Sequence, residues 1–209
     1  MPSGIMDVWI AKIPADLVLL NPRCLSGADA DLSGIRTDKP IALACGNRKI
    51  SVKLRYRDFG EGFVPSMEVS TTLAEQLKLT PYGRYRVRYD AKSGTLSMKP
   101  FPVNAASGAY LPGTRLAAGT ISIGCELLSR LGIPDRPGLR IQVQRAGRRQ
   151  PMRLQIPANL FDRNFRLSSR IGQAFRLRPG AKYPLKYDQR TGLLTISDWR
   201  SDVKTTGRA

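Results

Sequence analysis

Basic side chains at alternating positions are the feature of this sequence best suited to a chemical task. They stand two residues apart in two short runs: Lys53, Arg55 and Arg57, and then Arg84, Arg86 and Arg88. Because successive residues of a β-strand point to opposite faces, each run presents its cations on one face. Cations in line can contact successive phosphates, and each neutralised phosphate releases counter-ions that add to affinity. The two runs therefore predict binding of a polyanion, with a solvated exterior as the alternative.

A second basic group lies at an expected hairpin turn and in the segment after it. Its members are Arg145, Arg148, Arg149 and Arg153. The guanidinium group binds phosphate through a rigid fork of donors, so an arginine-rich turn can enter a groove or clamp a backbone. The alternative is a charged loop that discourages pairing between strand edges. We count these four residues as a second predicted site for the same polyanion.

Tyrosines add a possible stacking surface for single strands. The relevant residues are Tyr82, Tyr85, Tyr89, Tyr183 and Tyr187. All but Tyr82 alternate with other residues in strand-like segments, which favours packing in a core. Tyr82 lies at an expected turn, and we retain it alone as a candidate for stacking against a nucleobase.

The sequence offers little for catalysis, metal binding or a cofactor. It contains no histidine, which is the commonest general base and metal ligand. Cys24, Cys45 and Cys125 are far apart and form no CxxC pair, so they are interpreted as small buried residues. Asp90 and Asp188 occupy repeated turns, where an aspartate caps its own backbone. We predict no enzyme activity, no cofactor and no metal site.

Charge and length set the class of partner. The 209 residues include 34 Lys and Arg against 16 Asp and Glu, a formal net charge of +18. Such an excess predicts an anionic partner, DNA first, with RNA or an acidic protein as alternatives. No apolar run approaches the roughly 20 residues of a membrane span, and the first residues lack the pattern of a secretory signal. We therefore expect a cytoplasmic protein without a membrane partner; a homo-oligomer remains open.

An internal repeat organises the chain. Residues 67–98 align without gaps on residues 165–196, and their identical pairs include Ser70/Ser168, Leu79/Leu177, Pro81/Pro179, Tyr85/Tyr183, Tyr89/Tyr187, Asp90/Asp188, Gly94/Gly192 and Leu96/Leu194. A third copy spans residues 121–156. A weaker fourth copy is clearest at residues 41–45 and 50–54. The four copies predict two domains of two related halves each.

Each copy has the pattern of a strand, a short helix, a strand, a turn and a strand. Ser70 and Ser168 suit the N-cap of the helix, and we expect Pro81 and Pro179 to end the helical stretch. The segment from Phe101 to Gly113 is almost uncharged and rich in small residues, which favours a linker. We predict a first β-barrel at 1–100, a linker at 101–113, a second barrel at 114–198 and a tail at 199–209.

Residues 119–156 combine a strand, the helix 126–131, the pair Gly132-Ile133 and a hairpin. This order resembles the swapped-hairpin barrel of AbrB-like regulators, and it is similar to double-psi β-barrels such as the N-terminal barrels of some AAA ATPases. Both belong to the cradle-loop barrels. A weaker resemblance is to the repeat segment of spore-associated YheC/YheD-like proteins. The resemblance implies a mainly β protein of two tandem, six-stranded-type cradle-loop barrels, each built from two strand-helix-strand-strand repeats.

The resemblance also implies a function. A protein of the AbrB-like type would bind DNA without catalysis, with basic residues on its first strand and helix. The corresponding positions here hold Thr120, Leu128 and Ser129, with Arg115 and Arg130 as the neighbouring cations, which leaves non-specific anion binding as the expectation. The alternative from the same resemblance is a protein-interaction or assembly module, as in the ATPase N-domains or the spore-associated proteins.

Overall fold

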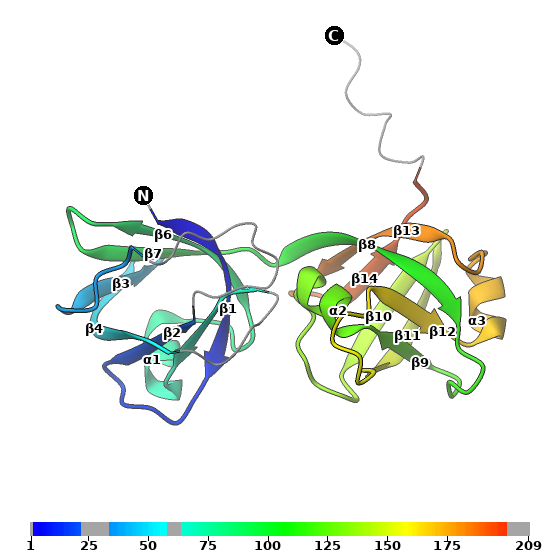
Figure 1. Ribbon diagram of the computed structural model, residues 1–209, viewed down its shortest axis with the longest axis horizontal. Coiled ribbons are helices and arrows are strands. Elements are labelled where there is room, and N and C mark those ends of the chain that lie inside the picture. The colour runs from blue at the N-terminus through cyan, green and yellow to red at the C-terminus, as the bar shows by residue number, and fades with distance from the viewer. Residues whose placement is uncertain (1, 22–33, 58–63, 200–209) are drawn as a thin grey trace, which may run out of the picture. The chain divides into compact units, whose positions relative to one another are not determined.

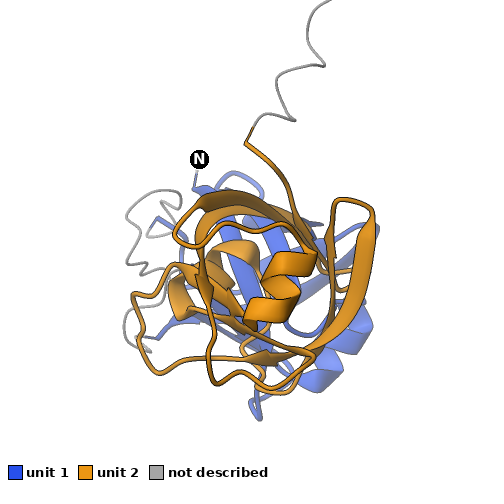
Figure 2. Cartoon of the chain, turned by 90° about the vertical axis from the view of Figure 1, so that its right-hand side faces the viewer, with its two compact units in different colours: residues 1–102 blue, residues 103–209 orange. Residues whose placement is uncertain are grey.

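The computed structural model describes residues 2–21, 34–57 and 64–199. The chain divides into two compact units, Met1–Pro102 and Val103–Ala209 (Figure 2). Each unit contains one closed β-barrel (Figure 1). The prediction of a mainly β protein with two tandem barrels is confirmed. Each barrel has seven strands, one more than the six-stranded type expected from the repeats.

The first barrel is built from seven strands and one helix among its described residues. In barrel order the strands are β1 (Ser3–Ile10), β5 (Ser66–Val69), β2 (Leu17–Asn21), β4 (Arg48–Tyr56), β3 (Ile41–Cys45), β7 (Thr95–Pro100) and β6 (Arg84–Asp90). Helix α1 (Thr71–Leu77) connects β5 to β6. The other helix expected here would fall between β2 and β3, where residues 22–33, including Cys24, lie outside the described part of the chain.

The second barrel has the same order of equivalent strands. They are β8 (Val103–Pro112), β12 (Asn164–Leu167), β9 (Thr120–Ile123), β11 (Arg148–Gln155), β10 (Arg140–Arg145), β14 (Leu193–Ile196) and β13 (Lys182–Asp188). Helix α2 (Cys125–Leu131) follows β9, and helix α3 (Ser169–Ala174) follows β12. The expected repeats 121–156 and 165–196 thus each contain a strand, a helix and two further strands.

The predicted linker at 101–113 is wrong. Residues Val103–Pro112 form β8, which pairs in parallel with β12 and antiparallel with β13, as β1 pairs with β5 and β6. The low charge of this segment comes from small residues that the second core requires. A Cβ atom on Gly108 would stand 2.6 Å from Leu127 Cδ2 and 3.0 Å from the Arg163 carbonyl oxygen, so the neighbouring elements could not approach β8 as they do.

The helices begin as expected but end earlier than expected. The Ser70 hydroxyl accepts a hydrogen bond of 3.1 Å from the Leu73 amide and so caps α1; Ser168 occupies the same position without this bond. The end of α1 is Lys78, in a left-handed conformation with φ of 54°. Arg176 adopts φ of 52° just after α3. These turns stop the helices, and Pro81 and Pro179 lie beyond them.

Candidate polyanion interface

The outward faces of β4 and β11 carry cations at the same places in the two barrels. Through the shared strand pairing, each β4 residue corresponds to the β11 residue 100 positions later, so Lys49 matches Arg149 and Lys53 matches Arg153. All four side chains are exposed, and the residues between them alternate inward, with Val52 and Met152 buried. We call these strands with their cations the basic strands.

On the first basic strand, two of the three predicted cations have acidic partners. Lys53 Nζ lies 2.9 Å from an Asp16 carboxylate oxygen, and Arg57 Nη1 lies 3.8 Å from Glu68. Lys53, Asp16 and Arg57 are more than half exposed, whereas the Glu68 side chain is 22% exposed. Exposed cations of this kind contribute little to stability through their pairs and can exchange a carboxylate for a phosphate. Arg55 is exposed and has no carboxylate partner within the described ranges.

On the second basic strand, the cations are less neutralised. Arg148, Arg149 and Arg153 are exposed, and none has a carboxylate partner in the part of the chain that the structure describes. The amide of Arg153 donates to the Gly119 carbonyl as the amide of Lys53 donates to that of Asp16, so glycine replaces the acid found in the first barrel. Arg140 stands directly opposite Arg153 on β10. The positive charge is therefore more concentrated here.

The run on β6 does not join the first basic strand. Arg86 and Arg88 are exposed, and the Arg86 guanidinium lies 4.8 Å from the centre of the Phe101 ring. However, β3 and β7 separate β6 from β4 in the barrel. At about 4.8 Å per strand, the two rows stand about 14 Å apart around the barrel. The two predicted runs are therefore separate patches.

Arg84 is not on the surface as predicted. Its side chain is 3% exposed, and it forms two hydrogen bonds with the Asp7 carboxylate, from Nε at 2.7 Å and from Nη2 at 2.9 Å. Asp7 is its direct neighbour across the β1–β6 ladder. Such a two-pronged pair holds both side chains in place. Arg84 is thus a structural residue, and the prediction that it contacts phosphate is corrected.

Arg145 is also buried, contrary to the prediction. It is 4% exposed, its Nε donates to the Phe175 carbonyl at 2.6 Å, and its Nη2 lies 2.6 Å from Asp198. The guanidinium carbon stands 4.6 Å from the centre of the Tyr183 ring. Phe175 is the C-cap of α3, where a cation is favoured by the helix dipole. Arg145 therefore fastens a helix end and the segment after β14.

Sequence reasoning missed Lys49, which has the same place on its strand as Arg149. The signal was present as the gapless match of residues 41–56 with residues 141–156, which aligns Arg48 with Arg148 and Lys49 with Arg149. Arg48 has a structural contact, because its Nη1 donates to the Gln76 carbonyl in the last turn of α1 at 2.7 Å. Lys49 is the added candidate.

The positions implied by the AbrB-like resemblance lie on and beside α2. Leu128 is 4% exposed, and Arg130 is bound to Glu126, with Nε 2.9 Å from the carboxylate. Arg163 lies 2.6 Å from the same carboxylate. Burial opposes ionisation of Glu126, but the two arginines outweigh it, so its pKa lies below the usual value. At neutral pH this paired carboxylate is ionised and is therefore not a proton donor.

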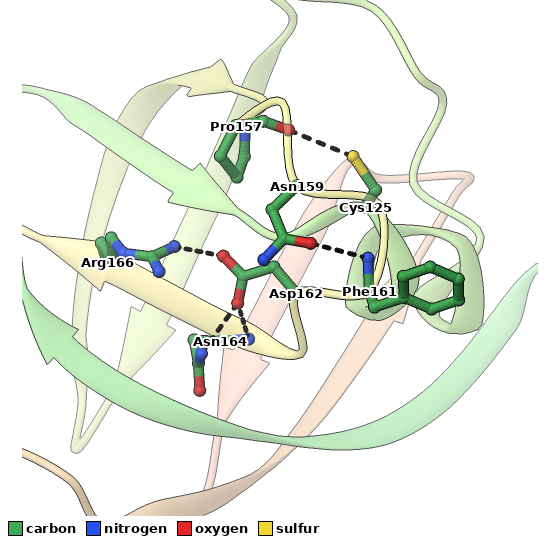
Figure 3. Close-up of polar contacts among 7 residues, drawn as sticks. All are labelled: Cys125, Pro157, Asn159, Phe161, Asp162, Asn164 and Arg166. Atoms are coloured by element: carbon green, nitrogen blue, oxygen red, sulfur yellow. Dashed lines mark hydrogen bonds and ion pairs between the residues drawn. The ribbon is translucent and has the colours of Figure 1, made fainter.

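A polar cluster beside α2 fixes the loop between β11 and β12 (Figure 3). Asp162 accepts hydrogen bonds from Arg166 Nη1 at 2.6 Å and from the Asn164 amide at 2.9 Å. Burial is the largest influence on Asp162, yet these bonds keep its pKa below the usual value. The Cys125 thiol donates to the Pro157 carbonyl, and burial raises the pKa of that thiol. The cluster is suited to holding a loop, since its acid is paired and its thiol is protonated.

The tyrosines lie as expected. Four of them are at most 6% exposed, and they are Tyr85, Tyr89, Tyr183 and Tyr187. Tyr82 is only partly buried. Its ring meets the ring of Trp9 edge to face, with 5.7 Å between centres and 72° between planes, so the retained stacking candidate has an aromatic neighbour.

Comparison with known proteins adds no assignment. Among the described residues, no helix is long and apolar enough to cross a membrane, and no group of three or more potential metal-ligating side chains lies together. No protein-family model, curated protein or solved structure matches the chain.

Proposed function

We propose that this protein binds DNA, or a closely similar polyanion, through its two basic strands and without catalysis. The observation that carries the proposal is the recurrence of Lys49 and Lys53 as Arg149 and Arg153 at equivalent places in two barrels. Much of the surface sequence differs between the barrels, whereas these positive charges are present in both. A solvated exterior requires no such correspondence.

The spacing of these cations suits a phosphate backbone. Lys49 and Lys53 are four residues apart on one strand and face the same way, which separates their Cα atoms by about 13 Å at 3.3 Å per residue. One strand of B-DNA advances about 3.4 Å per phosphate. Because the strand also winds around the helix axis, successive phosphates are farther apart than this rise, and a separation of about 13 Å suits phosphates about two positions apart. Arg149 and Arg153 can contact a second backbone in the same way.

The resemblance to cradle-loop barrels supports this proposal. In the second unit β9 and β12 run antiparallel, β11 lies parallel to β9, and β8 lies parallel to β12. The two halves therefore interlock around the β9–β12 pair, with a helix after each of these strands. We propose that the chain is a cytoplasmic member of this group, with non-specific DNA contacts of the AbrB-like regulator type moved from the helix to the basic strands.

The test is fluorescence anisotropy of labelled DNA at about 50 and 200 mM salt, a range over which phosphate contacts weaken steeply. The double variant Arg149→Glu/Arg153→Glu should lower affinity at least tenfold and flatten the salt dependence. Arg170→Glu/Lys182→Glu is the matched control, since it changes the charge of the same unit equally at exposed residues away from β11. If both variants lost the same DNA affinity, the loss would be explained by net charge and not by the basic strand. Absence of DNA binding at low salt would exclude the proposal.

One observation favours the second candidate, a protein-interaction module. Leu160 and Phe161 are 61% and 66% exposed on the loop between β11 and β12. The Asn159 side chain accepts a hydrogen bond from the Phe161 amide at 3.1 Å, and the neighbouring Asp162 cluster fastens the loop (Figure 3). A fixed pair of exposed apolar side chains suits a partner protein. If Leu160→Ser/Phe161→Ser abolished the chain's association with itself or a partner and left DNA affinity unchanged, this function would gain support.

A further inference from the structure

The turn before β6 has a backbone conformation that favours glycine, yet the first barrel places tyrosine there. Tyr82 has φ of 59°, and its counterpart 98 residues later, Gly180, has φ of 76°. Their amides make equivalent hydrogen bonds. The Tyr82 amide donates to the Val8 carbonyl at 2.9 Å, and the Gly180 amide donates to the Tyr110 carbonyl at 2.8 Å. A bulky residue in this left-handed region is strained. Strain that persists points to a use for the side chain.

The partner of Tyr82 is specific to the first barrel as well. Trp9 lies on the outer face of β1 and is 41% exposed, whereas its neighbour Val8 points inward and is fully buried. In the equivalent ladder, Trp9 stands opposite Glu68 and Leu111 stands opposite Arg166, so Leu111 is its counterpart. The second barrel thus closes with leucine and glycine. The fold does not need the aromatic pair.

Cations lie on the same side of the first barrel as this pair. Glu68 is directly opposite Trp9 on β5, and Arg57 Nη1 lies 3.8 Å from the Glu68 carboxylate. On β2, Leu19 pairs with Glu68 and with Arg55 of β4, but Leu19 is 8% exposed, so Arg55 stands three strands from Trp9 with a buried residue between them. An exposed aromatic pair with an arginine nearby suits an anionic chain that bears flat rings.

We propose that the Trp9–Tyr82 pair is a stacking site for an unpaired nucleobase, so that the first barrel binds single-stranded nucleic acid. Arg57 contacts a phosphate next to that base, and Arg55, three strands from Trp9, contacts the nucleic acid farther along its backbone. The inference rests on the proposed polyanion binding and adds its substrate form. The second barrel, with Leu111 and Gly180 at these places, contacts phosphate alone and does not distinguish single strands from duplex.

The experiment uses the full chain with Trp199→Phe, which leaves Trp9 as the one tryptophan. The probes are a short oligothymidine, the same oligonucleotide with abasic sites, and a duplex of equal length. We expect oligothymidine to quench Trp9 fluorescence and the abasic strand to leave it nearly unchanged. Quenching of equal size by both strands would overturn the stacking site.

Two variants copy the second barrel and so keep the fold: Trp9→Leu and Tyr82→Gly. Each should weaken oligothymidine binding at least about fivefold, which corresponds to the lower end of base–aromatic stacking, about 1 kcal/mol. Duplex affinity and melting temperature should change little, because glycine suits the left-handed turn. Unchanged oligothymidine affinity in both variants, with DNA still bound, would overturn this inference alone. Absence of DNA binding by the parent chain would overturn the proposed function with it.

Discussion

The Tyr110 ring occupies the space that a side chain on Gly172 would need. A Cβ atom at Gly172 would stand 2.5 Å from Tyr110 Cζ and closer still to its hydroxyl. In the first barrel the equivalent residues are Ala74 and Val8, a larger residue on the helix facing a smaller one on the strand. Both pairs are buried. The second barrel thus fills this helix–strand contact with a large side chain from the strand, whereas the first barrel fills it with side chains from both the helix and the strand.

Because the two residues share one space, the effect of Gly172→Ala on stability should change sign when Tyr110 is replaced by a smaller residue. Gly172→Ala alone should lower the free energy of unfolding by about 1–2 kcal/mol, because overpacking outweighs the better helix propensity of alanine. In the Tyr110→Val background the same substitution should raise it, since the methyl group then fills vacated space. Chemical denaturation of the four proteins of this cycle measures the coupling. Additive effects would show that the two residues do not share one space.

Arg145 and Arg148 should separate stability from binding. Arg145→Ala should destabilise the second barrel by about 2–4 kcal/mol, because a buried arginine with bonds to a helix end and an acid is lost. Its effect on DNA affinity, measured on folded protein, should be small. Arg148→Ala should do the reverse, with an unchanged melting temperature and weaker binding at low salt. If folded Arg145→Ala lost as much DNA affinity as Arg148→Ala, Arg145 would be a DNA-contacting residue after all.

Two equivalent basic strands predict two binding sites on each chain. With duplexes of about ten base pairs, titration calorimetry should give two sites for the parent protein. It should give one site for Arg149→Glu/Arg153→Glu and one for Lys49→Glu/Arg55→Glu. On longer DNA each variant should lose more than half of the parent protein's affinity. Two linked sites bind one DNA molecule more tightly than either site alone, because binding at the first raises the effective concentration at the second. One site in the parent protein would contradict the equivalence of the two strands.

Acid should weaken the second barrel through Glu126. Its pKa is lower in the folded chain than its ordinary value, because Arg163 and Arg130 outweigh the effect of burial. The stability that it provides is therefore complete above the ordinary glutamate pKa of about 4.3, and it is lost as the pH falls through the folded value. Glu126→Gln should be less stable than the parent at pH 7, by about 1–3 kcal/mol.

The check is the denaturation midpoint measured at several pH values between 7 and 3. The parent protein should lose more stability over this range than Glu126→Gln, so their curves should converge in acid. Curves that run parallel would assign the acid sensitivity to other carboxylates, with Asp162, whose pKa is also lowered in the folded state, as the first to examine.

Local patterns carried much of the fold. Alternation placed Tyr85 and Tyr89 in the core, and identity at a fixed offset of 98 residues predicted the equivalence of β5–β7 with β12–β14. Two features escaped because they depend on distant residues. Arg84 is held by Asp7, 77 positions away, and Arg145 by Asp198, 53 positions away, so no local pattern distinguished these arginines from their exposed neighbours.

Composition misled where packing required small residues. Gly108 and its uncharged neighbours have the composition of a linker and were predicted to form one. Glycine is needed at this position of β8 because Leu127 and the Arg163 backbone approach closely. Only part of the candidate site could be predicted, because its layout also depends on contacts between distant parts of the chain. Strand alternation indicates which residues face outward, but the order of strands around the barrel separates Arg86 from Arg55, and that order is a property of the whole chain.

The parallel ladders that close the barrels also set an order for folding. The pairs Ala42 with Thr95 and Gln142 with Leu193 join the third and the last described strand of each barrel in chain order, so neither barrel can close until its final hairpin is present. Yet the first barrel is complete at Pro100, before β8 begins. During synthesis from the N-terminus, the first barrel can satisfy its strands before their counterparts in the second leave the ribosome. This order of synthesis favours pairing within each barrel over exchange of strands between the two copies.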